Sequence, residues 1–388
     1  MQRPGERSVF AAFFGNLDYL QIGAMALLLG TGLIFINSTG EQVGTVASRA
    51  FFGKQVIWII CGTVLYFVLA AVDYRSLPVR FFVFGAYLAA VVLLIAVLFF
   101  GKEIFGARRW LDLGGFRLQP SELAKLTVIC VLANIFSAVR FRREPLTAIG
   151  LAAAAVLVPF MLIVVEPDLG SALILLPVFG SMLFCYGIKW RYVLLTLLLV
   201  VFGVTFILVD CFVLDKPVAL REYQVTRIKV FFNPKMDIRN RGNNAYQAMN
   251  SVGSGGWSGK GIGKGTQNEL GFLPQTVSNN DFIFSVLAEE TGFAGALALL
   301  MFYGTLIYTV LRTAFLTSGY GRYLAVGIGT MLFCHIFINI GMNIGIAPIT
   351  GLPLPLVSYG GSFTLTGMGT LGVVQSVYRC RRLEAQRR

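Results

Sequence analysis

The stretch Phe81–Phe100, FFVFGAYLAAVVLLIAVLFF, decides the fold because it runs for 20 residues without one charged side chain. A helix of that length is about 30 Å long, which matches the hydrocarbon thickness of a bilayer. The whole chain agrees with it, since 56% of the 388 residues are hydrophobic and only 13% are charged. Soluble domains carry roughly 25% charged residues. The sequence therefore predicts an integral membrane protein.

Similar apolar runs recur along the chain, and we expect about ten transmembrane helices in a single all-α membrane domain, 1–388. The tenth run is rich in Gly, Ser and Thr, which favours contact with other helices over contact with lipid. A connection of unusual length, 210–280, separates the seventh and eighth spans and indicates a functional segment. The expected spans are 19–36, 56–72, 81–100, 121–139, 146–165, 169–188, 192–209, 281–310, 323–346 and 360–377.

The distribution of Lys and Arg predicts that both termini are cytoplasmic. Ten spans put both ends on one side, and every segment expected on that side carries at least two basic residues. On the outer side the basic residues concentrate in two segments, 101–119 and 210–280. Topology does not require positive charge there, so these segments suit a site for an anion. A solvated basic loop is the simpler alternative.

Nucleic-acid binding, disulfide bonding and His-ligated metal sites are all disfavoured by the composition. The formal net charge is +13, but the basic residues lie between apolar blocks and form no continuous stripe. The six cysteines include no CxxC pair, and most of them lie in apolar runs. Because His335 is the only histidine, acid–base chemistry is left to carboxylates.

Two polar motifs lie where the fourth span meets the outer side. Arg108, Arg109 and Trp110 place two guanidinium groups beside an indole, which suits phosphate oxygens and a sugar face. An interfacial anchor is the alternative for Trp110. Glu122 and Lys125 follow in the first turn of the expected helix and share one face. Ionisable residues at membrane depth are functional candidates.

Two further outer segments carry candidate binding residues. In the short connection Glu166-Pro167-Asp168, Asp168 either contacts substrate or caps the sixth helix. The glycine-rich segment 253–267 holds Lys260 and Lys264 but lacks the spacing of a nucleotide-binding loop. Glycines that admit a close ligand, together with two lysines, still suit an anionic headgroup.

Asp281 stands where the long outer segment meets the eighth span, at the boundary between water and lipid. A base that acts on a lipid-borne sugar has to lie at this depth, and an N-cap role for Asn280 or Asp281 is the alternative. Glu289 and Glu290 lie two turns deeper and need partners there.

Uncharged polar residues mark the last two spans. His335, Asn339 and Asn343 form one stripe on the ninth span, which predicts interhelical hydrogen bonds. The last outer segment, 347–362, has three prolines and no charge, and backbone of that kind is tolerated at membrane depth only against protein or a cavity.

Seven ordered motifs resemble the SEDS family of bacterial cell-shape and division proteins over nearly the whole chain: GARRW, QPSExxK, PDLG, GSGGxxGKGxGxGTQ, LGFLP, DFIFxVxAEExG and PxTGLPLPxxSYGGS. The segment 265–274 is similar to the elongation branch of that family. One motif departs from the pattern. Where the family usually has Pro-Glu-x-His-Thr-Asp, this chain reads PQTVSNND over 274–281, so the aspartate is kept while the Glu and His are missing.

The resemblance implies a peptidoglycan glycosyltransferase that polymerises lipid II for cell elongation and rod shape. The implied reaction forms a β-1,4 link by one inverting displacement, with undecaprenyl pyrophosphate as the leaving group and Asp281 as the base. The implied location is the bacterial cytoplasmic membrane, with the active site on the outer face. The expected substrate-binding residues are Arg108, Arg109, Trp110, Glu122, Lys125, Asp168, Lys260, Lys264, Gln267, Ser358 and Ser362.

The resemblance also implies partners, namely the nascent glycan strand, a class B penicillin-binding protein and other membrane proteins of the elongation machinery. No motif demands a cofactor, although a divalent cation, Mg²⁺ or Mn²⁺, would share the pyrophosphate charge. Two alternatives stay open, a lipid II flippase and a non-catalytic scaffold. A flippase needs basic residues on both faces of its cavity, whereas Lys125 is the only cation inside an expected span.

Overall fold

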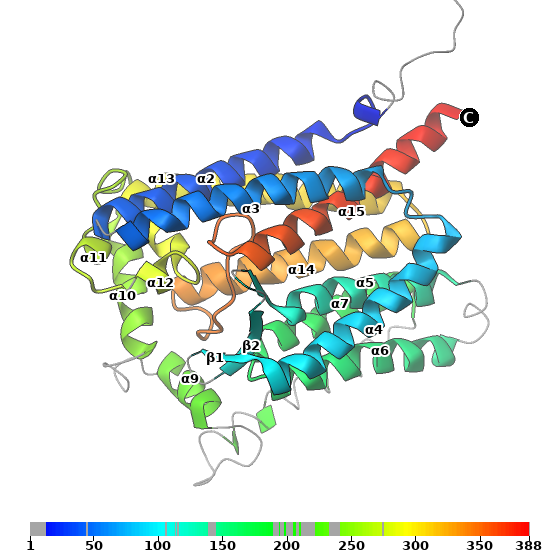
Figure 1. Cartoon of the computed structure of the whole chain (residues 1–388), viewed down its shortest axis with the longest axis horizontal. Helices are drawn as coiled ribbons and strands as arrows, with labels where there is room; N and C mark the ends of the chain where they lie inside the picture. The colour runs from blue at the N-terminus through cyan, green and yellow to red at the C-terminus, as the bar shows by residue number, and fades with distance from the viewer. Residues whose placement is uncertain are drawn as a thin grey trace, which may run out of the picture.

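The helical membrane fold expected from the sequence is confirmed (Figure 1). This computed structural model describes residues 13–43, 46–104, 107–112, 114, 116–138, 145–188, 194, 198, 205–206, 209–210, 222–232, 241–273 and 275–387. The seventh expected span, 192–209, falls almost entirely outside these residues. Within the described part, eight helices are long and apolar enough to cross a membrane. They are α2 (Tyr19–Val43), α3 (Val46–Ala71), α4 (Leu77–Phe100), α5 (Pro120–Ser137), α6 (Pro145–Val165), α7 (Leu169–Tyr186), α13 (Ile283–Leu316) and α14 (Tyr320–Asn343).

The tenth expected span corresponds to α15 (Gly361–Arg387), whose composition is more polar than that of the other long helices. It packs closely on α3 through glycines of both helices. A Cβ added at Gly372 would lie 2.6 Å from the carbonyl oxygen of Tyr66, and one added at Gly62 would lie 2.5 Å from Sδ of Met368. Small residues at the contact thus let the two backbones approach, as the composition of this run predicts.

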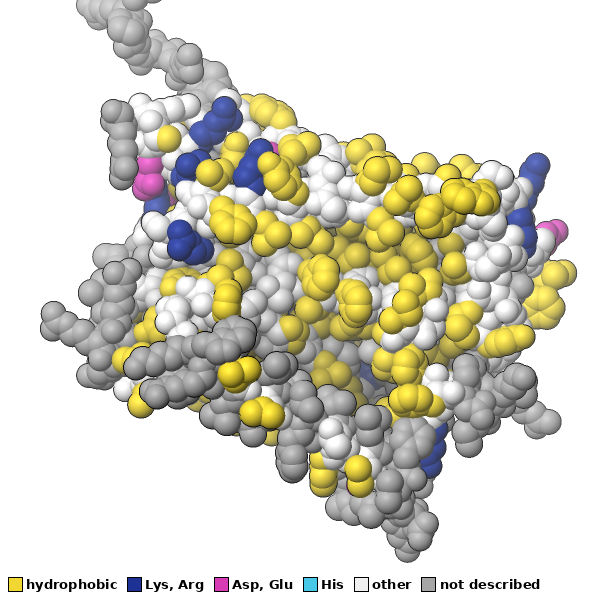
Figure 2. All heavy atoms as spheres, turned by 180° about the vertical axis from the view of Figure 1, so that it is seen from behind, with side chains coloured by type: hydrophobic (Ala, Val, Ile, Leu, Met, Phe, Trp, Pro, Cys, Tyr) yellow, Lys and Arg dark blue, Asp and Glu magenta, His cyan; other side chains and the backbone are white. Residues whose placement is uncertain are grey.

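Apolar surface covers the middle of one face of the molecule (Figure 2). On the face shown in Figure 2, hydrophobic side chains spread over the central part while Lys and Arg lie toward the ends. The side chains of Phe81, Phe99 and Phe100 on α4 are among the most exposed large hydrophobics. Such a band is what a helical bundle presents to lipid.

The two ends of the described chain lie together at one end of the bundle, and α10, α11 and α12 lie at the other (Figure 1). Gln386 Nε2 donates a 3.0 Å hydrogen bond to the side chain of Asn16, and Arg382 donates to the carbonyl of Gly15. This agrees with an even number of spans.

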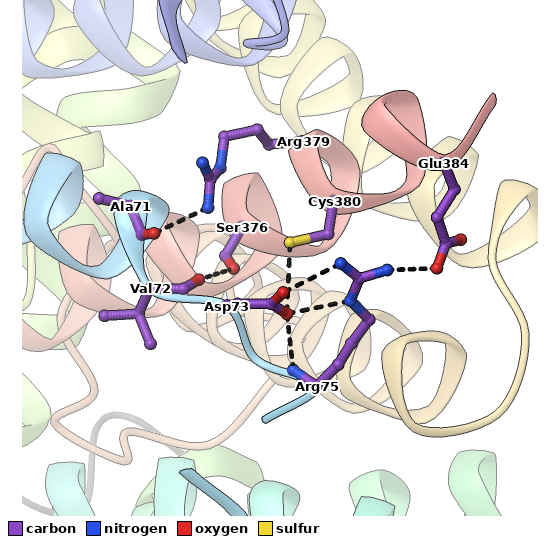
Figure 3. Close-up of polar contacts among 8 residues, drawn as sticks. All are labelled: Ala71, Val72, Asp73, Arg75, Ser376, Arg379, Cys380 and Glu384. Atoms are coloured by element: carbon purple, nitrogen blue, oxygen red, sulfur yellow. Dashed lines mark hydrogen bonds and ion pairs between the residues drawn. The ribbon is translucent and has the colours of Figure 1, made fainter. Parts of the chain in front are cut away.

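A carboxylate cluster fastens α15 to the connection after α3 (Figure 3). Asp73 accepts hydrogen bonds from the backbone and guanidinium of Arg75, and the thiol of Cys380 lies 3.6 Å from one of its oxygens. Arg75 also bridges to Glu384 on α15. Two further contacts, from Ser376 and Arg379, reach the carbonyls of Val72 and Ala71.

A small antiparallel sheet, which the sequence analysis did not predict, joins α4 to α5. It consists of β1 (Lys102–Ile104), β2 (Ala107–Asp112) and β3 (Arg117–Leu118) in the order β1-β2-β3. Successive side chains of a strand point to opposite faces. Arg109 on β2 is accordingly buried while Arg108 is exposed.

The connection 210–280 contains helices that the sequence analysis did not predict. This segment contains α9 (Glu222–Phe232), α10 (Arg241–Ser254), α11 (Thr266–Glu269) and α12 (Gln275–Ser278). Ala248 of α10 packs with Leu273 and Phe282 in a small core of its own. Hydropathy does not predict these helices because they are short and polar on average. Tertiary packing stabilises them.

Candidate active site

Asp281 lies in the tight turn that leads from α12 into α13. Its backbone N–H donates to the carbonyl of Val277 at 3.0 Å, and its side chain is half-buried. The residue that caps α13 is Phe282, which makes no side-chain capping bond. The alternative role of Asn280 or Asp281 as the N-cap is therefore wrong.

The backbone around Asp281 is held by the polar stripe of α14. Asn339 Nδ2 and Asn343 Nδ2 donate to the carbonyl oxygen of Asp281 at 2.9 and 3.2 Å. Ser285, one turn into α13, donates to Asn343 Oδ1 at 2.5 Å. These bonds confirm the interhelical role predicted for the stripe, and they fix the turn without using the carboxylate.

The segment 347–362, between α14 and α15, folds back against the same turn. Ser358, which is completely buried, donates to the carbonyl of Asn280 at 2.5 Å and accepts from Leu354 N at 2.8 Å. The N–H of Tyr359 donates to the carbonyl of Asn279 at 2.9 Å. At Gly351, whose φ of +74° favours glycine, an added Cβ would lie 3.4 Å from Asp281 Oδ2. Ser358 therefore clamps the backbone next to Asp281.

A second polar centre lies between α5 and α14. Lys125 Nζ is 2.8 Å from Glu122 Oε1 and 2.8 Å from His335 Nε2, and all three side chains are buried. His335 and Asn339 are one helical turn apart on the same face of α14. One turn of this helix therefore binds Lys125, and the next binds the backbone of Asp281. A buried lysine with one carboxylate and one imidazole is satisfied inside the bundle.

A third centre joins the sheet, α5 and α7. Arg109 Nη1 lies 3.7 Å from Asp168 Oδ1, and Nη2 donates to the carbonyl of Pro167. Gln119 Nε2 and Ser121 Oγ donate to Asp168 Oδ2 at 3.1 and 3.4 Å. Asp168 also accepts weakly from Ser171 N at the start of α7, so it both caps that helix and pairs with Arg109. The backbone of Gln119 donates to Ser362 Oγ, which ties α15 to this centre.

Glu166 is a buried carboxyl beside this centre, and neither of its oxygens has a hydrogen-bond partner among the described residues. Burial is the main reason that the pKa of Glu166 rises from 4.5 to about 9. The negative charge of Asp168 adds to this rise, and the positive charge of Arg109 opposes it. The sequence shows that Glu166 lies close to Asp168, but it does not show that Arg109 interacts with both carboxyl groups. The centre therefore holds two carboxyls and one guanidinium.

The glycine-rich segment does not form an open cradle. Lys260 Nζ is bound to Glu289 Oε1 at 2.6 Å and to Thr266 Oγ1 at 2.7 Å, whereas Lys264 is exposed. Trp110 is half-exposed on β2. Gln267 belongs to α11, but its side chain lies outside the described residues.

The structure thus brings Asp281, Ser358 and the α14 stripe together, and it gathers Glu122 with Lys125, and Arg109 with Asp168 and Ser362. Sequence reasoning missed Asn279, Gln119 and Thr266, which are polar residues whose partners are remote in sequence. Among the described residues, no group of three or more His, Cys, Asp and Glu side chains is placed to hold a metal ion.

These features define a polytopic helical membrane protein whose buried ionisable residues collect where its helices meet the connecting segments. Residues 19–383 match the family model described as cell cycle protein, which covers FtsW, RodA and SpoVE. The chain belongs to this family.

Two curated relatives are similar over almost their full length. The peptidoglycan glycosyltransferase MrdB of Escherichia coli (strain K12) is 36% identical over 92% of this chain and 92% of its own. The peptidoglycan glycosyltransferase RodA of Treponema pallidum (strain Nichols) is 32% identical over 93% of this chain and 97% of its own.

Two solved structures are similar as well. A chain of a peptidoglycan synthase complex that coordinates polymerization and crosslinking aligns with a TM-score of 0.77 and 28% identity, covering 94% of this chain and 98% of that one. The crystal structure of the rod shape determining protein RodA of Thermus thermophilus aligns with a TM-score of 0.66 and 27% identity, covering 94% and 97%.

Proposed function

We propose that this chain is a peptidoglycan glycosyltransferase that polymerises lipid II on the outer face of the cytoplasmic membrane, with Asp281 as the base. Membership of the family and the activity named for its relatives support the reaction. The observation that carries the choice of base is the turn at Asp281, whose carbonyl oxygen is held by Asn339 and Asn343 while its carboxylate is half-buried. An oriented carboxylate at the edge of the bundle suits proton abstraction.

In the proposed reaction the 4-hydroxyl of the acceptor sugar attacks the anomeric carbon of the donor sugar. Asp281 takes the hydroxyl proton as the new C–O bond forms, and the bond to undecaprenyl pyrophosphate breaks on the opposite face. An α-linked donor then gives a β-1,4 link in one step. The exposed Arg108 and Lys264 and the half-exposed Trp110 suit the pyrophosphate and sugar. Arg109 and Lys260 contact internal carboxylates and act, in this proposal, by shaping the site.

The proposal includes a class B penicillin-binding protein as a partner, because a similar chain forms part of a complex that couples polymerization with crosslinking. A divalent cation, Mg²⁺ or Mn²⁺, is kept as a companion of the substrate's pyrophosphate, and titration of the reaction with EDTA tests it. We further propose that both termini are cytoplasmic. Reporters fused after Gln267 and after Arg388 should then give opposite signals, and a cytoplasmic signal at Gln267 would overturn the assignment of the active face.

The direct test is polymerisation of purified lipid II by the purified chain in proteoliposomes, with and without its cognate transpeptidase. The expected result is a ladder of glycan strands that requires the chain. Movement of labelled lipid II between leaflets without polymer would favour the flippase. Polymer that appears only with the transpeptidase, and equally with Asp281→Asn, would favour the scaffold.

A further inference from the structure

The long helix α13 is broken near its outer end, and the break separates a short segment that begins next to Asp281. Gly292 has φ 67° and ψ −162°, which no helix contains, so Ile283–Thr291 is not a rigid extension of the rest of α13. The direction of this short segment therefore depends on contacts with its surroundings.

The glycine-rich segment 255–266 fills that break with its own backbone. Lys260 N donates to the carbonyl of Glu289 at 3.0 Å and Gly261 N to that of Glu290 at 2.9 Å, while Phe293 N and Ala294 N donate back to Gly256 and Trp257. A Cβ at position 255, 259 or 292 would overlap backbone atoms across this contact. The glycines are thus explained by the close approach of two chain segments.

Two adjacent buried carboxylates anchor the short segment. Glu289 Oε1 accepts from Lys260 Nζ at 2.6 Å and from the N–H and hydroxyl of Thr266 at 2.9 Å each. Glu290 accepts from Ser38 at 2.5 Å and Gln42 at 2.7 Å on α2, and from Gly263 N at 3.1 Å. Both carboxylates hold the glycine-rich segment, and Glu290 also holds α2.

Asp281 lies at the far end of the same short segment. The helix from Ile283 to Glu289 rises about 9 Å at 1.5 Å per residue, and Asp281 lies two residues before its start. A tilt of about 5° to 10° at the anchored end would move the Asp281 end by about 1–2 Å over that span. Displacements of about 1 Å at a reacting group cost as much as 100-fold in rate.

We propose that Lys260 and Thr266, through Glu289, and Ser38 and Gln42, through Glu290, are positioning residues that set the place of Asp281. This inference rests on the proposed role of Asp281 as the base. It gives the glycine-rich segment a second task besides any contact with the substrate, namely to brace a broken helix.

A labelling experiment tests the positioning without using the reaction. Asp281→Cys is made in a chain whose own cysteines are replaced, and its reaction with a small hydrophilic thiol reagent is followed. Thr266→Val and Lys260→Ala should change the labelling rate by about threefold or more, as expected when one or two anchoring hydrogen bonds are lost. Ser258→Ala, an exposed hydroxyl of the same segment, is the control and should leave the rate unchanged.

A kinetic experiment in the chain with Asp281 intact completes the test. Thr266→Val and Lys260→Ala should lower kcat for lipid II by about 10- to 100-fold with KM little changed, since alignment and not binding is lost. Lys260→Arg should recover part of kcat. Unchanged labelling in both variants would overturn the positioning role whatever the activity. If the variants alter the labelling rate but the chain with Asp281 intact makes no polymer, the positioning role is upheld and the proposed function is refuted.

Discussion

Lys125 and His335 lie 2.8 Å apart through Nζ and Nε2, which joins α5 to α14 inside the membrane. Because an ammonium group can only donate, Nε2 of His335 accepts and the ring proton sits on Nδ1. Glu122 supplies the negative charge on the other side of the lysine at 2.8 Å. The three side chains form a buried ion pair in which the imidazole accepts a second hydrogen bond from the ammonium group.

Substitutions of Lys125 and Glu122 should have non-additive effects on the free energy of unfolding. Lys125→Met leaves the carboxylate of Glu122 buried without its cation and should lower the free energy of unfolding by about 3–5 kcal/mol. The double variant Lys125→Met with Glu122→Gln should regain most of that loss, as measured by thermal unfolding in detergent. Equal unfolding temperatures for the single and double variants would contradict a buried pair.

Substitutions of Arg108 and Arg109 should have different effects although the two residues are neighbours in sequence. Arg109→Ala removes the only guanidinium near Asp168 and Glu166 among the described residues and should destabilise the protein by about 3 kcal/mol. Arg108→Ala should leave unfolding unchanged and weaken use of the donor by about 10-fold or more, the effect of one lost charge-assisted contact. Thermal unfolding and KM for lipid II decide the matter. If instead Arg108→Ala lost stability and Arg109→Ala weakened use of the donor, β2 would have to bury Arg108 and expose Arg109, which would contradict the assignment.

Glu166 should make the protein less stable as the pH rises. Its pKa is raised from 4.5 to about 9 in the folded chain, so between these values the folded state holds a proton that the unfolded state has released. The free energy of unfolding then falls with rising pH by up to about 1.4 kcal/mol per unit. Glu166→Gln, which cannot ionise, should gain stability over the wild type at pH 8 and little at pH 5. The exposed Glu269→Gln is the control, and an equal gain at both pH values would contradict the assignment.

The hydrogen bonds of Asp73 should control access to Cys380 on α15 (Figure 3). The hydrogen bond from the Arg75 side chain lowers the pKa of Asp73 to about 2, so this residue is charged at neutral pH and holds both Arg75 and the buried thiol. Asp73→Ala should speed maleimide labelling of Cys380 by about 10-fold or more, because at least one charge-assisted bond is lost. Asp112→Asn on β2 should have no effect. Labelling that stays slow in Asp73→Ala would show that packing alone holds α15.

Much of this fold follows from the sequence because lipid leaves few choices. An uncharged run such as Phe81–Phe100 has to cross as a helix, and the glycines and threonines of α15 predict a helix packed on protein. The need of Glu289 and Glu290 for partners also follows from their depth. Their actual partners do not, since Ser38 lies 252 residues from Glu290 and no local pattern joins them. The helices of 210–280 and the small sheet are likewise set by tertiary packing.

The site shows the same division. Residue type and spacing predict the roles of the Asp281 carboxylate and of the α14 stripe. They do not predict that the stripe binds the backbone carbonyl of Asp281. Arg109 looked available for a phosphate because its sequence neighbours are basic and aromatic. Strand alternation turns it inward to Asp168, and only the pairing of β1, β2 and β3 reveals that alternation.

The central claim is that the carboxylate of Asp281 is the base. Asp281→Asn suits this test because Asn339 and Asn343 bind the backbone carbonyl of residue 281, which the substitution keeps. The measurement is the initial rate of lipid II polymerisation by the purified variant, at matched abundance and unfolding temperature, with the exposed Asp112→Asn as control. We expect Asp281→Asn to lose about 10²- to 10⁴-fold in rate, the usual contribution of a general base, and Asp281→Glu to recover little. A rate for Asp281→Asn close to that of the wild type would contradict the assignment.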